Sequence, residues 1–107
     1  MSEGRSLRTV LEPAAAELAD VERVAVGDAV ELRRAGRPFA RLEPATAAFR
    51  LDAVLAPAAL RTPDTSTSAL GPDWVAFAPA IVDGFAVDRA SAWLEAAWRR
   101  AAPAART

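Results

Sequence analysis

The chain has 107 residues, of which 52% are hydrophobic and 25% charged, with a formal net charge of −1 at pH 7. This length suits one domain with a single core, and the charge balance excludes a strong overall attraction to nucleic acid or to an anionic membrane. Histidine, lysine and cysteine are all absent. The absence of cysteine excludes disulfides, thiol catalysis and thiolate metal sites.

The sequence also indicates where the protein resides. No apolar run reaches the roughly 18 residues that a membrane-spanning helix needs. The first residues, MSEGRSLRTVLEP, lack the apolar core of a secretory signal. We therefore expect a cytoplasmic protein without a membrane partner. Since arginine supplies every basic residue, the composition is typical of a GC-rich bacterial genome.

The first half of the chain predicts one helix followed by four short strands. Residues 6–19 show the apolar spacing of a helix, with Ser6 as its cap. Pro13 either kinks this helix or lies in the first turn of one that begins near Leu11. Alternating apolar and polar residues predict strands over residues 21–26, 29–34, 38–43 and 47–52. Gly36 suits the turn of the hairpin between the second and third strands.

The second half predicts a short helix, a strand and a closing helix. The short helix covers residues 54–60, the strand covers residues 73–78, and the polar stretch 61–72 between them is predicted to be a loop. Residues 89–102 repeat their apolar positions with helical spacing, and Asp88 is the predicted cap. The whole chain, residues 1–107, is therefore expected to form one α+β domain. Its antiparallel sheet would carry the N- and C-terminal helices on one face.

Arginines gather on the predicted hairpin and the strand after it. Residues 29–50 hold five arginines against two glutamates, a local balance of +3. These arginines are Arg33, Arg34, Arg37, Arg41 and Arg50. Alternation places Arg33 and Arg41 on the outer face of the hairpin, with Arg34 and Arg37 beside its tip. This wing could clamp the phosphates of double-stranded DNA, or it could simply be the solvated face of the hairpin.

The tryptophans allow two interpretations. Trp93 and Trp98 lie on the apolar stripe of the closing helix, and Trp74 lies on the strand before it. They can supply the bulk that alanine lacks in a core. They can also line a pocket or an interface for a small ligand, another protein or a second copy of the chain.

Catalysis and metal binding find little support in the residue types. General acid–base chemistry near neutral pH usually recruits histidine, lysine or a carboxylate with a shifted pKa. Glu31, Glu43 and Asp52 lie near arginines in sequence, which favours ordinary ionised carboxylates. Arginines are interspersed among the acidic residues in the region of the first helix, as on a solvated face. We therefore predict no catalytic residue, no metal and no cofactor.

Several segments resemble the MmcQ/YjbR-like family of small bacterial proteins. DWVAF and VDRASAWLEAAWRRAAP are similar to the family's tryptophan-bearing strand and closing helix. ELRRAGRPFARL and AAFRLD are similar to its hairpin and the strand that follows. The resemblance covers residues 14–105 and implies a frataxin-like α+β sandwich, with DNA binding as the associated function. The polar segment TSTSALGP departs from the family, because it is short and lacks the histidine pair of a related group.

A second resemblance is local. Residues 27–44, GDAVELRRAGRPFARLEP, are similar to the hairpin of Phd/YefM-type antitoxins. Those proteins continue into a flexible toxin-binding tail, whereas this chain continues into a predicted strand and helix. The sequence thus predicts a non-enzymatic binding module with double-stranded DNA as its partner. The alternative is a protein-interaction or ligand-binding domain that uses the apolar surface near the tryptophans.

Overall fold

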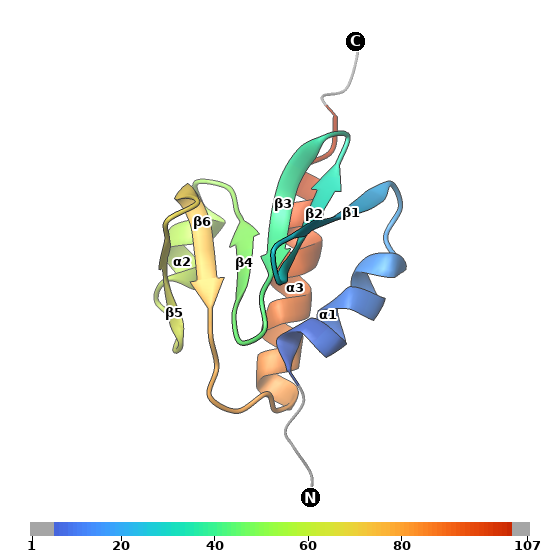
Figure 1. Cartoon of the computed structure of the whole chain (residues 1–107). Helices are drawn as coiled ribbons and strands as arrows, with labels where there is room; N and C mark the ends of the chain where they lie inside the picture. Colours follow the sequence, from blue (N-terminus) through green and yellow to red (C-terminus); the bar gives the residue numbers. More distant parts are fainter. Residues whose placement is uncertain (1–5, 104–107) are drawn as a thin grey trace, which may run out of the picture.

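Six strands form one antiparallel sheet in the computed structural model, which describes residues 6–103 (Figure 1). The strands lie in the order β1-β2-β3-β4-β6-β5, so that β1 and β5 are the edges. Their bounds are Val21–Val26 (β1), Ala29–Arg34 (β2), Arg37–Leu42 (β3), Ala47–Arg50 (β4), Thr65–Ser68 (β5) and Gly71–Phe77 (β6). Each of the first four strands pairs with the next along the chain except β4, which pairs with β6.

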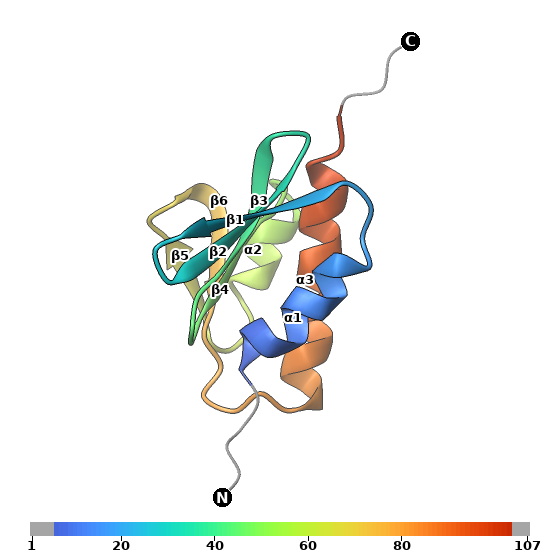
Figure 2. The same ribbon diagram turned by 45° about the vertical axis from the view of Figure 1, so that its right-hand side comes forward.

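Three helices accompany the sheet: α1 (Leu7–Ala16), α2 (Leu55–Ala59) and α3 (Gly84–Arg100). Figure 2 shows α1 and α3 side by side on the same side of the sheet. The short α2 adds Ala56 and Ala59 to the same core. The predicted α+β class, with the first and last helices on one face, is therefore confirmed. None of the helices in residues 6–103 combines the length and apolar character needed to cross a membrane.

The helix starts follow their capping residues. The Ser6 hydroxyl accepts a hydrogen bond from the Thr9 amide at 3.2 Å, and Pro13 lies inside α1 rather than at its start. Helix α3 begins at Gly84, five residues before the predicted start, because Asp83 caps it instead of Asp88. The Asp83 carboxylate accepts from the Ala86 amide at 2.9 Å, which satisfies one of the unpaired amides of the first turn.

The predicted loop over residues 61–72 was wrong, because this stretch contains β5 and the start of β6. Ser66 pairs with Ala76 and Thr67 with Val75, so β5 provides hydrogen-bonding partners for the edge of β6 that faces away from β4. The Thr65 hydroxyl donates to the Ala59 carbonyl oxygen at 3.1 Å and thereby ties β5 to α2. Backbone pairing has overridden the turn preference of a Ser/Thr-rich segment.

A bulge in the hairpin determines which residues lie opposite its arginines. The β2–β3 register shifts between Leu32 and Arg33, and both Phe39 and Ala40 are buried in the core. Arg33 consequently lies opposite Pro38, and Arg34 lies opposite Arg37. Ala35 and Gly36 form a two-residue turn with φ values of 53° and 78°, as a type I′ hairpin turn requires.

Candidate anion-binding site

The arginines of the hairpin lie on two faces of the sheet. Arg41 lies between the core residues Ala40 and Leu42 in sequence, so alternation directs it away from the helices. Arg33 lies on the same outer face, as predicted. Arg34 and Arg37, which flank the turn, both contact α3 or the residues just after it. These four arginines therefore do not all lie on one face, and Arg50 lies next to both groups, because it lines one hollow with Arg37 and another with Arg41.

On the outer face, carboxylates accompany the arginines. Arg33 Nε lies 2.7 Å from Glu31 Oε2, and Arg41 Nε lies 3.9 Å from Glu43 Oε2. Within residues 6–103, Arg41 Nε is buried without a hydrogen-bond partner. The charges on this face largely cancel, so it offers an anion little net attraction.

Arg34 is engaged by Trp98 of α3. Its Cζ lies 3.9 Å from the centroid of the indole ring, and its Nη1 donates to the Trp98 carbonyl oxygen at 2.9 Å. The indole N–H of Trp98 in turn donates to the Ala19 carbonyl oxygen at 2.8 Å. The contacts show Arg34 as part of the packing between hairpin, α3 and the segment after α1.

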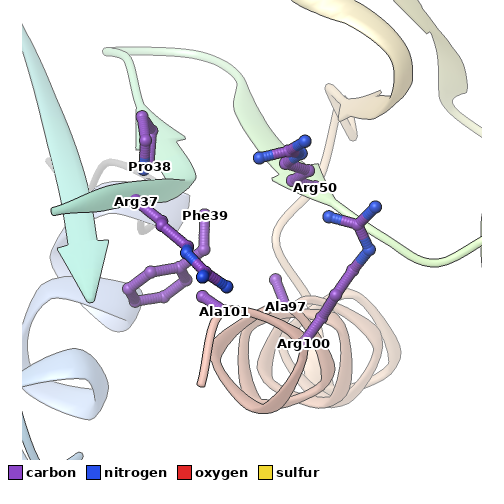
Figure 3. Close-up of a pocket in the computed structure, with 7 residues that line it drawn as sticks. All are labelled: Arg37, Pro38, Phe39, Arg50, Ala97, Arg100 and Ala101. Atoms are coloured by element: carbon purple, nitrogen blue, oxygen red, sulfur yellow. The ribbon is translucent and has the colours of Figure 1, made fainter. Parts of the chain in front are cut away.

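Three other arginines surround one hollow at the C-terminal end of α3. Arg37 comes from β3, Arg50 from β4 and Arg100 from α3 (Figure 3). The hollow has a volume of about 430 Å³, and its remaining lining is Pro38, Phe39, Ala97 and Ala101. We call it the arginine hollow. Arg37 and Arg50 were among the predicted site residues, whereas Arg100 was not.

Asp73 of β6 holds two of these arginines in place. Its Oδ2 lies 2.9 Å from Arg50 Nε and 3.0 Å from Arg100 Nη2. The hydrogen bond from Arg50 is the main cause that lowers the pKa of Asp73, which keeps this carboxylate ionised. Arg37 Nη1 makes one long hydrogen bond of 3.5 Å to the Ala102 carbonyl oxygen. Three positive charges thus face the hollow with one negative charge beside them.

Replacing Asp73 by asparagine is expected to lower the free energy of unfolding by about 1 kcal/mol at pH 7, because both ion pairs are lost. The folded-state pKa of Asp73 is lowered, so its contribution is present above the unfolded value of about 3.9 and is lost as pH falls through the folded value. Urea denaturation of both proteins at pH 7, 5 and 3 should show the difference shrinking in acid. Glu95→Gln, which removes an exposed pair with Arg99, is the control. A difference that stayed constant with pH would contradict this role for Asp73.

The three tryptophans lie in separate places. Trp93 belongs to the core, where it meets Phe77 edge to face at 5.1 Å between ring centroids. Trp98 is half-buried under Arg34. Trp74 pairs with Arg50 across β4 and β6 and lines a second hollow of about 370 Å³, together with Leu70 and Arg41. They therefore do not share one pocket.

In the part of the chain that the structure describes, no group of three acidic, histidine or cysteine side chains is placed to hold a metal ion. The Asp52 carboxylate accepts hydrogen bonds from the Val54 and Leu55 amides at the start of α2 instead.

No protein-family model, curated protein or solved structure matches the chain.

Proposed function

We propose that this chain is a non-enzymatic binding module of the MmcQ/YjbR-like type, whose partner is the phosphate backbone of double-stranded DNA. The observation that carries the proposal is the convergence of Arg37, Arg50 and Arg100 from three elements at one end of the molecule. Figure 1 shows the tip of the β2–β3 hairpin close to the C-terminal end of α3. This end of the molecule, rather than the outer face of the hairpin, is the proposed contact surface.

The chemistry of the guanidinium group supports a phosphate partner. A guanidinium presents several N–H donors in one plane and can hold two phosphate oxygens at once. Arg37 is exposed at the turn, and Arg100 lies at the end of a helix, so a rigid duplex can reach both. The net charge of −1 provides no long-range attraction, so we expect micromolar affinity at low salt.

The residue types around the hollow support a role in binding rather than in catalysis. The ion pairs of Asp73 favour its charged form, which makes it a poor proton donor near neutral pH. The neighbouring side chains are arginine, proline, phenylalanine and alanine, and none of these is a general base or a nucleophile at neutral pH.

The test is a fluorescence-polarisation titration of a labelled random duplex at two salt concentrations. With two or three phosphates neutralised, log affinity should fall with log salt with a slope of about −2 to −3. Arg37→Gln/Arg100→Gln should weaken binding by about tenfold and reduce the slope. Arg23→Gln/Arg61→Gln has the same change in charge at positions away from the hollow and should bind nearly as the wild type does.

A third variant separates the two faces of the hairpin. Arg33→Gln/Arg41→Gln removes the arginines of the outer face, which the proposal leaves out of the contact. If this variant loses affinity and Arg37→Gln/Arg100→Gln does not, the contact surface is wrongly placed. Absence of duplex binding by the wild type at low salt would overturn the proposal altogether.

A further inference from the structure

The arginine hollow is concave and lined by charge on several sides, a shape that differs from a flat strip along a DNA backbone. We infer that it is a binding site for a phosphate monoester, the terminal phosphate of a larger molecule. The inference goes beyond the proposed function, because a monoester can be a free small molecule as well as the phosphorylated end of a strand. It shares Arg37 and Arg100 with the proposed DNA contact and can be tested separately.

The shape of the hollow favours a group that projects from its carrier. The floor at α3 is made by Ala97 and Ala101, whose small side chains leave the space of about 430 Å³ open. Figure 3 shows Arg37, Arg50 and Arg100 around this space, each extending from a different element. A phosphodiester within a duplex has neighbours on both sides and meets such a hollow only at its rim. A terminal phosphate has one covalent neighbour and can enter it.

The charge of the hollow matches a monoester better than a diester. The three positive charges of the arginines are partly offset by the negative charge of Asp73. The C-terminal end of α3 adds the equivalent of about half a negative charge through its helix dipole. About +1.5 elementary charges therefore remain. A monoester carries about −1.5 to −2 at pH 7 because its second pKa is about 6. A diester carries a single negative charge, which leaves the arginines less well compensated.

The donors are already positioned. Within residues 6–103, Arg50 and Arg100 each donate one hydrogen bond to Asp73, and a guanidinium group has five N–H donors. The shared carboxylate fixes both groups without occupying the hollow, since Asp73 is not part of its lining. Preorganised donors of this kind lose little conformational entropy when a ligand binds.

The experiment is an NMR titration with methyl phosphate and, in parallel, dimethyl phosphate at pH 7.5 and constant ionic strength. The arginine Nε–Hε signals of Arg37, Arg50 and Arg100 report on the site directly. We expect methyl phosphate to bind at least ten times more tightly than dimethyl phosphate, with shifts at these three signals. Its affinity should fall between pH 7 and pH 5 as the monoester gains a proton.

Two neighbouring arginines provide a matched pair of variants. Arg100→Gln should weaken methyl phosphate binding by at least tenfold, whereas Arg99→Gln should leave it within twofold, because Arg99 pairs with Glu95 and does not line the hollow. Arg37→Gln, at the exposed first position of β3, supplies a second variant that should fold normally and bind weakly. Equal affinity for the two esters, or equal losses in the Arg99 and Arg100 variants, would overturn the inference.

A second set of ligands distinguishes the two molecules that could carry the monoester, a DNA strand end and a small molecule. Duplexes of one sequence with 5′-phosphate and 5′-hydroxyl ends are compared with methyl phosphate. If the phosphorylated duplex binds more tightly and Arg100→Gln abolishes this preference, the site recognises strand ends. If the two duplexes bind equally and methyl phosphate also binds, the site recognises a small molecule. Methyl phosphate binding without any duplex binding would overturn only the DNA proposal, and duplex binding without ester preference would overturn only this one.

Discussion

Replacing Trp93 by alanine is expected to lower the free energy of unfolding by about 3–5 kcal/mol. The side chain is 7% exposed and its ring packs near two phenylalanines of the sheet. Its ring centroid is 5.1 Å from that of Phe77 and 6.1 Å from that of Phe49. Alanine would leave a large cavity beside residues that are themselves small, since Ala90 and Ala97 flank this position on α3. The free energy of unfolding of such a domain is about 5–15 kcal/mol, so the variant would be partly unfolded at moderate temperature.

Urea denaturation followed by circular dichroism measures this loss. Val54→Ala is the control, because Val54 is 84% exposed and its truncation should change stability by less than about 0.5 kcal/mol. A loss below about 1 kcal/mol would contradict the role of Trp93 as a main packing residue of the core.

The first four strands could be predicted closely from the sequence, because each carries its own local signal. Residues 29–34 alternate between core and surface, and Gly36 provides the positive φ that the turn needs. The strand β5 has no such signal. Ser66 and Thr67 are exposed, so their alternation follows no hydrophobic pattern, and their pairing depends on β6 lying beside them. Tertiary pairing of this kind is not encoded in the segment itself.

The site was predicted only in part, because one residue type serves three purposes. Arg33 pairs with Glu31, Arg34 stacks on Trp98, and Arg37 lines the hollow, yet all three look alike in the sequence. The bulge beside Leu32 and Arg33, which sets the residues opposite Arg33 and Arg34, leaves no mark in the residue pattern. Arg100 was missed because its ion pair with Asp73 depends on where α3 ends over the sheet. Its signal was a basic residue in the last helical turn, which usually indicates only a favourable dipole.

Replacing Trp98 by alanine is expected to lower the free energy of unfolding by about 2–3 kcal/mol, less than at Trp93 because the side chain is half-buried. The variant loses the indole contact with Arg34 and the hydrogen bond to the Ala19 carbonyl oxygen. Trp98→Phe keeps a ring under Arg34 and removes the N–H donor, so it should cost only about 1 kcal/mol. Denaturation of both variants separates the ring from the hydrogen bond.

A double-mutant cycle between Trp98→Ala and Arg34→Ala then measures the stacked pair, with an expected coupling of about 0.5–2 kcal/mol. The Arg34→Ala variant of this cycle also tests whether Arg34 contributes to stability rather than to duplex binding. Because Arg34 is engaged by Trp98, Arg34→Ala should lower stability while duplex affinity stays within about twofold of the wild type. Additive stabilities would show that the stacking contributes nothing. A tenfold loss of duplex affinity in Arg34→Ala would show that this arginine leaves the ring to meet phosphate, and that the contact surface extends over the hairpin tip.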